Sequence, residues 1–339
     1  MKIPETMKAL IIDAYNSNLI RAMQAMKLME IPMPQPDENH VLIKIELTPV
    51  NPSDIAFLRG GYNISRPLPA IPGFEGTGKI VETGSGVDKS FVGRRVSFFS
   101  QSEYGTWAEY TVIRLSDCIF LNNDLSVEQA SCLFVNPFTA RGMFDHILTN
   151  GHQALIQSAA MGQIGQFIRY FARESNLPVI NLVRKDVHVE MLQAEGEQFV
   201  LNMTNEKFQD DLARMATALN ASAALDAVGG ELTGKILNAM PKGSELILYG
   251  GLSGIPVGQM DPLEIIFKNK VLWGFNLGDW LNDLSDIRLS KISDEIQTLF
   301  IQKKLETKIQ QIFPLENFYG GLRKYISNMS GGKVLFQCE

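Results

Sequence analysis

The sequence predicts an α/β fold in which a doubly wound parallel sheet is inserted in a mostly β domain. Two observations support this prediction. Residues 7–120 read mainly as short strands punctuated by Gly and Pro, whereas strands and helices alternate from Ser126 onward. Such β-α alternation implies a parallel sheet covered by helices on both faces. The length of 339 residues is enough for two domains with separate cores.

The elements follow from local patterns. Strands are expected at HVLIKIEL (40–47), GTGKIVETG (76–84) and GRRVSFF (93–99). Ser126 is a candidate N-cap for a helix that starts the second region. The later helices are expected near 163–175, 186–195, 206–219, 231–239 and 286–303, with apolar strands between the first four and a final strand in GKVLFQC. The domains are therefore expected to be 127–278, doubly wound, and 1–126 plus 279–339, mostly β.

The composition narrows the class of protein. The net charge of −6 argues against a nucleic-acid-binding protein, which needs a basic face. Three cysteines that lie far apart indicate a reducing compartment without a disulfide framework. The first residues lack a signal or transit peptide pattern, and no run of about 18 apolar residues is present. A cytoplasmic location and no membrane partner are expected.

The segment SAAMGQIGQ contains a candidate dinucleotide turn. Gly162 and Gly165 match the second and third glycines of the G-x-G-x-x-G pattern, and Ala160 stands at the first. The second glycine lets the backbone approach a pyrophosphate, and the third lets the helix pack close to the strand. The candidate cofactor residues here are Met161, Gly162, Gln163, Ile164 and Gly165. A simple strand-to-helix turn is the alternative.

Two cations end the next strand, about 20 residues after the last glycine. An NAD site would place Asp or Glu there to hold the ribose 2′-hydroxyl. Arg184 and Lys185 occupy that point instead, and a guanidinium can pair with a 2′-phosphate through two hydrogen bonds. The pair therefore favours NADPH over NADH. A solvated charge pair at the start of a helix is the alternative.

A second glycine-rich strand end lies in LYGGLSG (248–254). Strand ends at one edge of a parallel sheet converge on the ligand crevice. Tyr249, Gly250 and Gly251 are therefore further candidates for cofactor binding. An ordinary turn is again the alternative.

Together these segments resemble the medium-chain dehydrogenase/reductase family over nearly the whole chain. NPSD (51–54), PGFEGTGKIVETGSGV (72–87) and GTWAEY (105–110) are similar to its GroES-like catalytic domain. SAAMGQIGQ and ALDAVGG (224–230) are similar to its Rossmann cofactor domain. VNPFTA, INLVR, LYGG and GFNLGDW are closest to the 2-enoyl thioester reductase branch, with zinc-free quinone reductases less similar.

The resemblance also bears on metal. The zinc alcohol dehydrogenases of the family carry Cys where this chain has Asn51, and His where it has Phe74. No cysteine lies in 90–115, where a four-cysteine lobe would be expected, and the four histidines show no ligand spacing. We therefore expect no metal. Without a Lewis acid to polarise an alcohol or aldehyde oxygen, alcohol dehydrogenation is not expected.

The chemistry left is hydride transfer to a conjugated carbon, followed by protonation. Tyr62, in RGGYNISRPLP, corresponds to the tyrosine that the resemblance implies as proton donor. A phenol with a pKa near 10 is protonated at neutral pH. Tyr62 could instead only pack or line the pocket, and quinone reductases often carry a tyrosine here too.

The resemblance implies further site residues. Asn136 matches a residue beside the nicotinamide and substrate, although an amide before Pro137 could merely cap a helix or turn. Phe275 and Leu277 match a segment near the nicotinamide. Lys333 matches a lysine that meets the cofactor, with an exposed lysine before an edge strand as the alternative.

The leading hypothesis is thus an NADPH-dependent, zinc-independent reductase of activated double bonds that prefers trans-2-enoyl thioesters. An NADPH:quinone or small-enone oxidoreductase is the second hypothesis. A non-catalytic NADPH-binding protein is a third, disfavoured by Tyr62, Asn136 and the acidic charge. The apolar strand KVLWGFNLG could extend the sheet across a two-fold axis, so a homodimer is expected.

Overall fold

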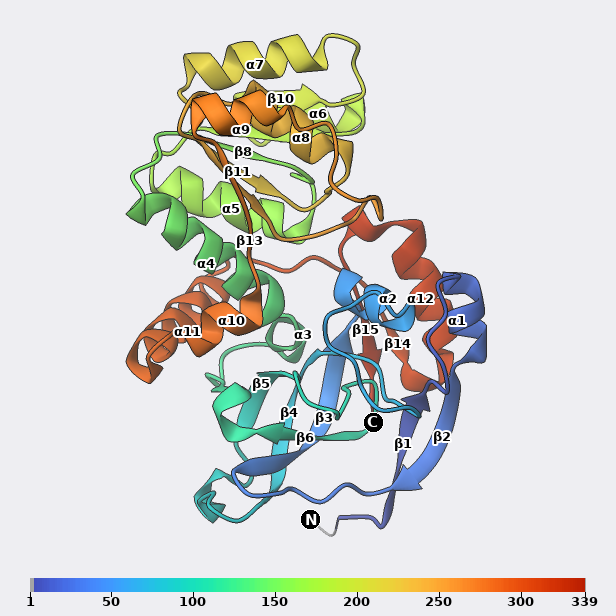
Figure 1. The fold of residues 1–339 in the computed structure, drawn as a ribbon. Helices are drawn as coiled ribbons and strands as arrows, with labels where there is room; N and C mark the ends of the chain where they lie inside the picture. Colours follow the sequence, from blue (N-terminus) through green and yellow to red (C-terminus); the bar gives the residue numbers. More distant parts are fainter. Residues whose placement is uncertain (1–2, 339) are drawn as a thin grey trace. The chain divides into compact units, whose positions relative to one another are not determined.

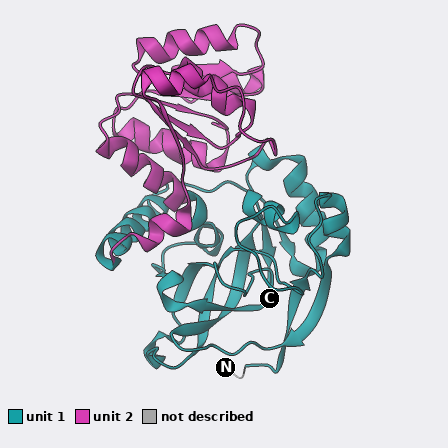
Figure 2. Ribbon diagram, viewed as in Figure 1, with its two compact units in different colours: residues 1–136, 286–339 teal, residues 137–285 magenta. Residues whose placement is uncertain are grey.

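A computed structural model describes residues 3–338. The chain divides into two compact units (Figure 2): unit 1 comprises 1–136 and 286–339, and unit 2 comprises 137–285. Each unit has its own main sheet.

Unit 2 contains a six-stranded sheet in which every neighbouring pair is parallel. Its strand order is β10-β9-β8-β11-β12-β13. The strands are β8 (Leu155–Gln157), β9 (Val179–Val183), β10 (Phe199–Asn202), β11 (Ala223–Asp226), β12 (Glu245–Leu248) and β13 (Val271–Gly274). The chain order therefore reverses between β8 and β11, which is the switch point of a dinucleotide-binding fold. The predicted doubly wound sheet is confirmed.

Helices lie on both faces of this sheet (Figure 1). On one face, buried residues of α7 (Phe208–Ala218) and α8 (Glu231–Ala239) share a core cluster with the apolar strands. On the other face, Phe144 of α4 (Val135–Thr149) packs at a tilt against Phe171 of α5 (Gln163–Glu174), with ring centres 5.8 Å apart. The remaining helices of unit 2 are α6 (Asp186–Ala194), α9 (Pro262–Lys268) and α10 (Leu277–Asn282). The helices predicted after the glycine turn form within two residues of their expected starts.

Unit 1 is built on a mixed seven-stranded sheet and a separate pair, β1 (Thr6–Ile11) with β2 (Lys27–Pro32). The large sheet runs β14-β15-β3-β4-β5-β7, and β6 also pairs with β3. Its strands are β3 (His40–Pro49), β4 (Glu75–Thr83), β5 (Arg95–Phe99), β6 (Tyr110–Arg114), β7 (Cys118–Phe120), β14 (Ile309–Pro314) and β15 (Lys333–Gln337). The mostly β fold class is thus present in this unit, although its last segment, 286–339, contains more helix than strand.

Helices of unit 1 connect these strands. They are α1 (Leu19–Ala25), α2 (Pro52–Leu58), α3 (Val127–Ser131), α11 (Asp286–Ile301) and α12 (Phe318–Ser327), with short 3-10 turns at Lys89–Phe91, Leu115–Asp117, Leu315–Asn317 and Met329–Gly331. The predicted cap at Ser126 is confirmed, because its hydroxyl accepts a hydrogen bond from the Gln129 amide. α2 matters most for the site, since the loop after it carries Tyr62.

The predicted strand KVLWGFNLG is only partly right. β13 ends at Gly274, and α10 begins at Leu277. The side chain of Asn276 accepts a hydrogen bond from the Asp279 amide at 3.2 Å. That capping bond starts a helix inside an apolar run that otherwise reads as strand.

None of the helices in residues 3–338 combines the length and apolar character that a membrane crossing requires.

Candidate active site

In unit 2, the buried carboxylate of Asp226 links the carboxyl ends of β8 and β11 through hydrogen bonds at the switch point. Asp226, the last residue of β11, accepts a 2.6 Å hydrogen bond from the hydroxyl of Ser158, which follows β8. It also accepts from the Thr233 hydroxyl at 2.7 Å and the Val228 amide at 2.8 Å. This network fixes both loops that border the ligand crevice of such a sheet.

The glycine turn follows β8 and leads directly into α5. Gly162 is the N-cap of this helix, and the predicted residues Met161, Gln163 and Ile164 beside it are half-buried. A Cβ on Gly165 would lie 2.6 Å from the carbonyl oxygen of Ala160, so the helix reaches its strand only with glycine there. The unpaired amides of a helix N-terminus in such a turn fit a pyrophosphate.

Replacing Gly165 by Ala should destabilise the protein. The new methyl group would collide with backbone rather than with a flexible side chain, and overpacking of this kind costs about 1–3 kcal/mol. We expect the midpoint of thermal unfolding to fall by several degrees. Gly258→Ala is the matched control, because a Cβ there meets nothing within 4 Å. Equal melting of the two variants would contradict the close packing at Gly165.

The predicted cation pair follows β9, the neighbour of β8. Arg184 and Lys185 are both exposed, and Lys185 is the N-cap of α6. The two charges also act on His188, one helical turn further on. Partial burial, and then the positive charges of Lys185 and Arg184, lower the pKa of its imidazole. The positive potential around Arg184 and Lys185 suits an anionic group such as the 2′-phosphate of NADPH.

The other predicted nucleotide residues follow β12 and β13. The Tyr249 amide donates to the Asp226 carbonyl at 2.9 Å, and burial raises the pKa of its phenol. A Cβ on Gly250 would lie 2.7 Å from the Ala227 carbonyl oxygen, whereas Gly251 is open. Phe275 packs 6.1 Å from Trp280, measured between ring centres, and Leu277 beside them is buried. Unit 2 thus gathers its predicted residues along one edge of the sheet.

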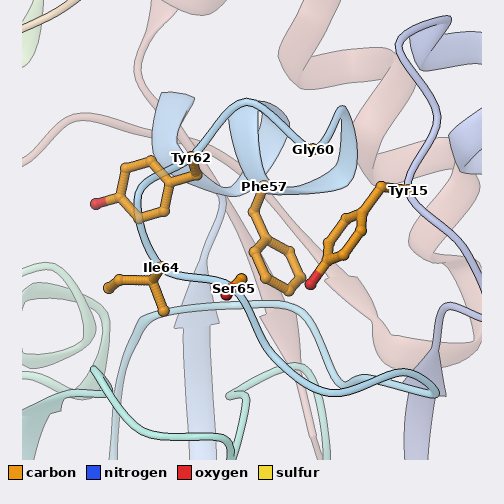
Figure 3. Close-up of a pocket in the computed structure, with 6 residues that line it drawn as sticks. All are labelled: Tyr15, Phe57, Gly60, Tyr62, Ile64 and Ser65. Atoms are coloured by element: carbon orange, nitrogen blue, oxygen red, sulfur yellow. The ribbon is translucent and has the colours of Figure 1, made fainter.

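Unit 1 holds Tyr62 beside a small cavity (Figure 3). The cavity is lined by Tyr15, Phe57, Gly60, Tyr62, Ile64 and Ser65. The ring of Tyr62 packs against Phe74, with centres 4.9 Å apart. The hydroxyl of Tyr62 in Figure 3 points away from Phe57 and Tyr15.

The environment of Tyr62 keeps its phenol protonated. Burial, and then the negative charge of Asp54, raise its pKa to about 12. The positive charge of Arg66 and a hydrogen bond with Ser53 oppose that rise. Tyr62 can therefore present a proton throughout the neutral range. Burial and Asp54 destabilise its anion, whereas Arg66 and Ser53 stabilise it.

Arg66 orders the loop that carries Tyr62. The residue is 3% exposed, and its guanidinium lies over the ring of Phe74, 4.5 Å from the centre. Burial lowers its pKa to about 10. Its shortest hydrogen bonds go to three backbone carbonyls, those of Ser102 (2.8 Å), Ile71 (2.7 Å) and Gly73 (3.0 Å). The loop and the ring behind Tyr62 are therefore held by one side chain.

A buried polar cluster lies behind this loop. Glu75, at the start of β4, accepts from the side-chain amide of Asn51 at 3.0 Å, and the ammonium of Lys333 hydrogen-bonds the Asn51 carbonyl oxygen. Asp54 accepts from the Asn51 amide at 2.6 Å, and burial raises its pKa to about 7. Lys333 is 4% exposed, and β15 lies between β14 and β3. The alternative interpretation of Lys333, as an exposed lysine before an edge strand, is therefore wrong.

Asn136 is the second residue of α4 and is 7% exposed. It lies inside the first helical turn rather than before it. The two residues that precede it donate their backbone amides to Glu75. Asn136 thus follows directly after the two residues whose amides Glu75 holds, and Lys333 belongs to the same cluster as Glu75.

Asn51 and Phe74, which stand where the zinc alcohol dehydrogenases carry Cys and His, have other contacts here. Asn51 is engaged by Glu75 and Lys333, and Phe74 packs between Phe57 and Tyr62. Across residues 3–338, no group of three or more His, Cys, Asp or Glu side chains is placed to hold a metal ion.

Sequence reasoning did not assign a role to Glu75, Asp54, Arg66 or Asp226. Each is a charged residue inside or beside an apolar segment, and burial of an unpaired charge is costly. That signal, an isolated charge where a core residue is expected, could have singled them out. Their partners could not be named, because they lie far away in the sequence.

Comparison with known proteins agrees with this architecture. Residues 37–123 match the model of the alcohol dehydrogenase GroES-like domain. A mitochondrial enoyl-[acyl-carrier-protein] reductase of Caenorhabditis elegans is 31% identical over 248 residues, covering 73% of this chain and 71% of that protein. The Arabidopsis thaliana enzyme of that name is 28% identical, covering 89% and 81%.

Solved structures include both branches expected. A Mesorhizobium loti protein to which NADPH:quinone reductase activity has been ascribed is 33% identical, with a TM-score of 0.93 and coverage of 99% and 100%. The mitochondrial 2-enoyl thioester reductase heterodimer of Candida tropicalis shares the fold at 23% identity, with a TM-score of 0.80 and coverage of 98% and 99%. An Etr1p complex with NADP and crotonyl-CoA, at 24% identity, has the same TM-score.

The GroES-like unit and the doubly wound unit define a two-domain oxidoreductase fold. The chain belongs to the medium-chain dehydrogenase/reductase superfamily, in the group that contains the 2-enoyl thioester reductases and NADPH:quinone oxidoreductases.

Proposed function

We propose that this protein is an NADPH-dependent, zinc-independent reductase of activated carbon–carbon double bonds, with trans-2-enoyl thioesters as preferred substrates. The observation that carries the proposal is Tyr62, a half-buried phenol that stays protonated and lines a small pocket. The curated relatives named as enoyl reductases support the substrate class.

The nucleotide would lie along the carboxyl edge of the unit 2 sheet. The amides at the start of α5, with Gly162 and Gly165, would hold the pyrophosphate. Arg184 and Lys185 would pair with the 2′-phosphate. Tyr249, Gly250, Gly251, Phe275 and Leu277 would border the nucleotide further along the same edge. Lys333 stays a proposed cofactor-binding residue.

The bound nicotinamide supplies the hydride that adds to Cβ of the substrate. Negative charge then moves onto the thioester oxygen, where the side-chain amide of Asn136 would donate a hydrogen bond. Tyr62 would give its proton to Cα, directly or through one water. Arg66 and Ser53 would stabilise the phenolate that remains until solvent returns the proton.

No metal ligand is needed for this chemistry. Conjugation already activates Cβ, and a hydrogen bond suffices at the oxygen that gains charge. The neutral amide of Asn51 and the ring of Phe74 do not suit a zinc ion, and the ammonium of Lys333 beside Asn51 would repel one.

Absorbance of NADPH at 340 nm tests the proposal, with trans-2-hexenoyl-CoA and 1,4-benzoquinone compared as acceptors. We expect kcat/KM to be higher with the thioester. Turnover of quinone alone would establish the second candidate, an NADPH:quinone oxidoreductase, which the likeness to the Mesorhizobium loti protein favours. NADPH binding without turnover of either acceptor would indicate a non-catalytic protein.

We also propose a homodimer formed through the open edge of the unit 2 sheet. β13 is one of the two edge strands, and apolar side chains on and beside it are exposed: Leu263, Ile266, Phe267 and Val271. Apolar groups of this kind commonly mark an interface. A monomer mass in light scattering would contradict it. The cytoplasmic location expected from the sequence stays a prediction, since curated relatives carry mitochondrial names.

A further inference from the structure

Glu75 is a buried carboxylate that the proposed reaction does not use directly. It is 1% exposed, at the first position of β4. Burial raises the pKa of its carboxyl, and the ammonium of Lys333 and several hydrogen-bond donors oppose that rise. Burial of a carboxylate costs free energy unless both oxygens accept hydrogen bonds. The partners of Glu75 therefore indicate why a carboxylate is placed there.

The two oxygens of Glu75 face different parts of unit 1. Oε1 accepts from the backbone amides of Phe134, at 2.9 Å, and Val135, at 2.7 Å. Oε2 accepts from the side-chain amide of Asn51 at 3.0 Å, and Asn51 is in turn held by Lys333. One chain of hydrogen bonds therefore runs from β15, through the start of α2, to the start of α4.

The backbone amides that donate hydrogen bonds to Glu75 lie at the N-terminal end of α4. Such groups have no partner within the helix, and a carboxylate there also interacts favourably with the helix dipole. Asn136 is the next residue along the chain. With two consecutive amides bound to one oxygen, the backbone that carries Asn136 cannot rotate without breaking a charged hydrogen bond.

We propose that Glu75 is a positioning residue for Asn136: it fixes the start of α4 so that the Asn136 amide meets the thioester oxygen. The proposal rests on the role of Asn136 in the proposed function. Asn51, which is held by Lys333, orients the carboxylate of Glu75 from the opposite side.

The test is a double-mutant cycle on kcat with trans-2-hexenoyl-CoA. Glu75→Met removes both acceptor oxygens at similar side-chain length, and we expect kcat to fall about 10- to 100-fold with little change in the Kd of NADPH. Asn136→Ala should lower kcat to a similar extent. If Glu75 acts through Asn136, adding Glu75→Met to Asn136→Ala should lower kcat by less than about threefold more.

Two further variants control the cycle. Glu75→Gln keeps an oxygen for the Phe134 and Val135 amides, so it should retain a larger share of kcat than Glu75→Met. Glu82→Met, at the other end of β4, should leave kcat unchanged. If Glu75→Met fails to fold, Glu75→Asp replaces it, because the shorter side chain withdraws the oxygens from the two amides.

The outcomes separate the two claims. Multiplicative losses in the cycle, or wild-type kcat in Glu75→Met, would overturn the positioning role while the proposed function stands. An unimpaired Asn136→Ala variant in an active enzyme would also overturn it. Absence of thioester turnover by the wild-type protein would overturn both.

Discussion

Tyr62→Phe should reduce kcat for trans-2-hexenoyl-CoA by roughly 100- to 10,000-fold, the range that general acid catalysis contributes. The substitution removes only the hydroxyl, so the ring contact with Phe74 is retained. NADPH binding should be unchanged. Because the pKa of Tyr62 is about 12, the wild-type rate should show no loss from its ionisation up to about pH 10.

Tyr319→Phe is the matched control for this prediction. Tyr319 lies half-buried in α12 of the same unit and has no role in the proposed reaction. It should keep wild-type kcat. If Tyr62→Phe retains kcat as well, Tyr62 is a wall of the pocket and the proton comes from water.

Replacing both Arg184 and Lys185 by Ala should weaken NADPH binding by about 10- to 100-fold and leave NADH binding nearly unchanged. A charge-assisted hydrogen bond contributes about 1.5–3 kcal/mol, and only NADPH carries the 2′-phosphate that would receive it. Both side chains are exposed, so the fold should not be affected. Titration of intrinsic or nucleotide fluorescence gives the two Kd values.

Arg214→Ala serves as the control for charge removal. Arg214 is an exposed arginine of unit 2 that pairs with Asp211 of its own helix, at 2.7 Å. It should not change the ratio of the two Kd values. A proportional loss of NADPH and NADH binding in the double variant would show that the cations act on a part common to both nucleotides.

Most of the unit 2 fold could be predicted from local sequence. Glycine at 165, a strand before it and an amphipathic helix after it follow from short-range packing rules, and the structure shows the close approach directly. The helix at Leu277–Asn282 could not be predicted as easily. Its start depends on one capping bond of Asn276 within an apolar run that is equally compatible with a strand.

The site was predictable only in part, for a physical reason. Arg184 and Lys185 follow a strand at fixed spacing from the glycine turn, so their position could be inferred from sequence. Lys333 and Asn51 form one buried contact although 282 residues separate them. The raised pKa values of Asp54 and Tyr62 depend on burial, which local patterns do not specify.

The most direct test of the central claim is isotope placement in the product. The enzyme would reduce trans-2-hexenoyl-CoA with NADPH carrying deuterium on the transferred C4 position, in ordinary water, and the hexanoyl product would be examined by NMR. Hydride transfer to an activated double bond predicts one deuterium at Cβ and none at Cα. With unlabelled NADPH in D2O, the label should move to Cα. Deuterium at Cα in the first experiment, or no hexanoyl product at all, would contradict the account.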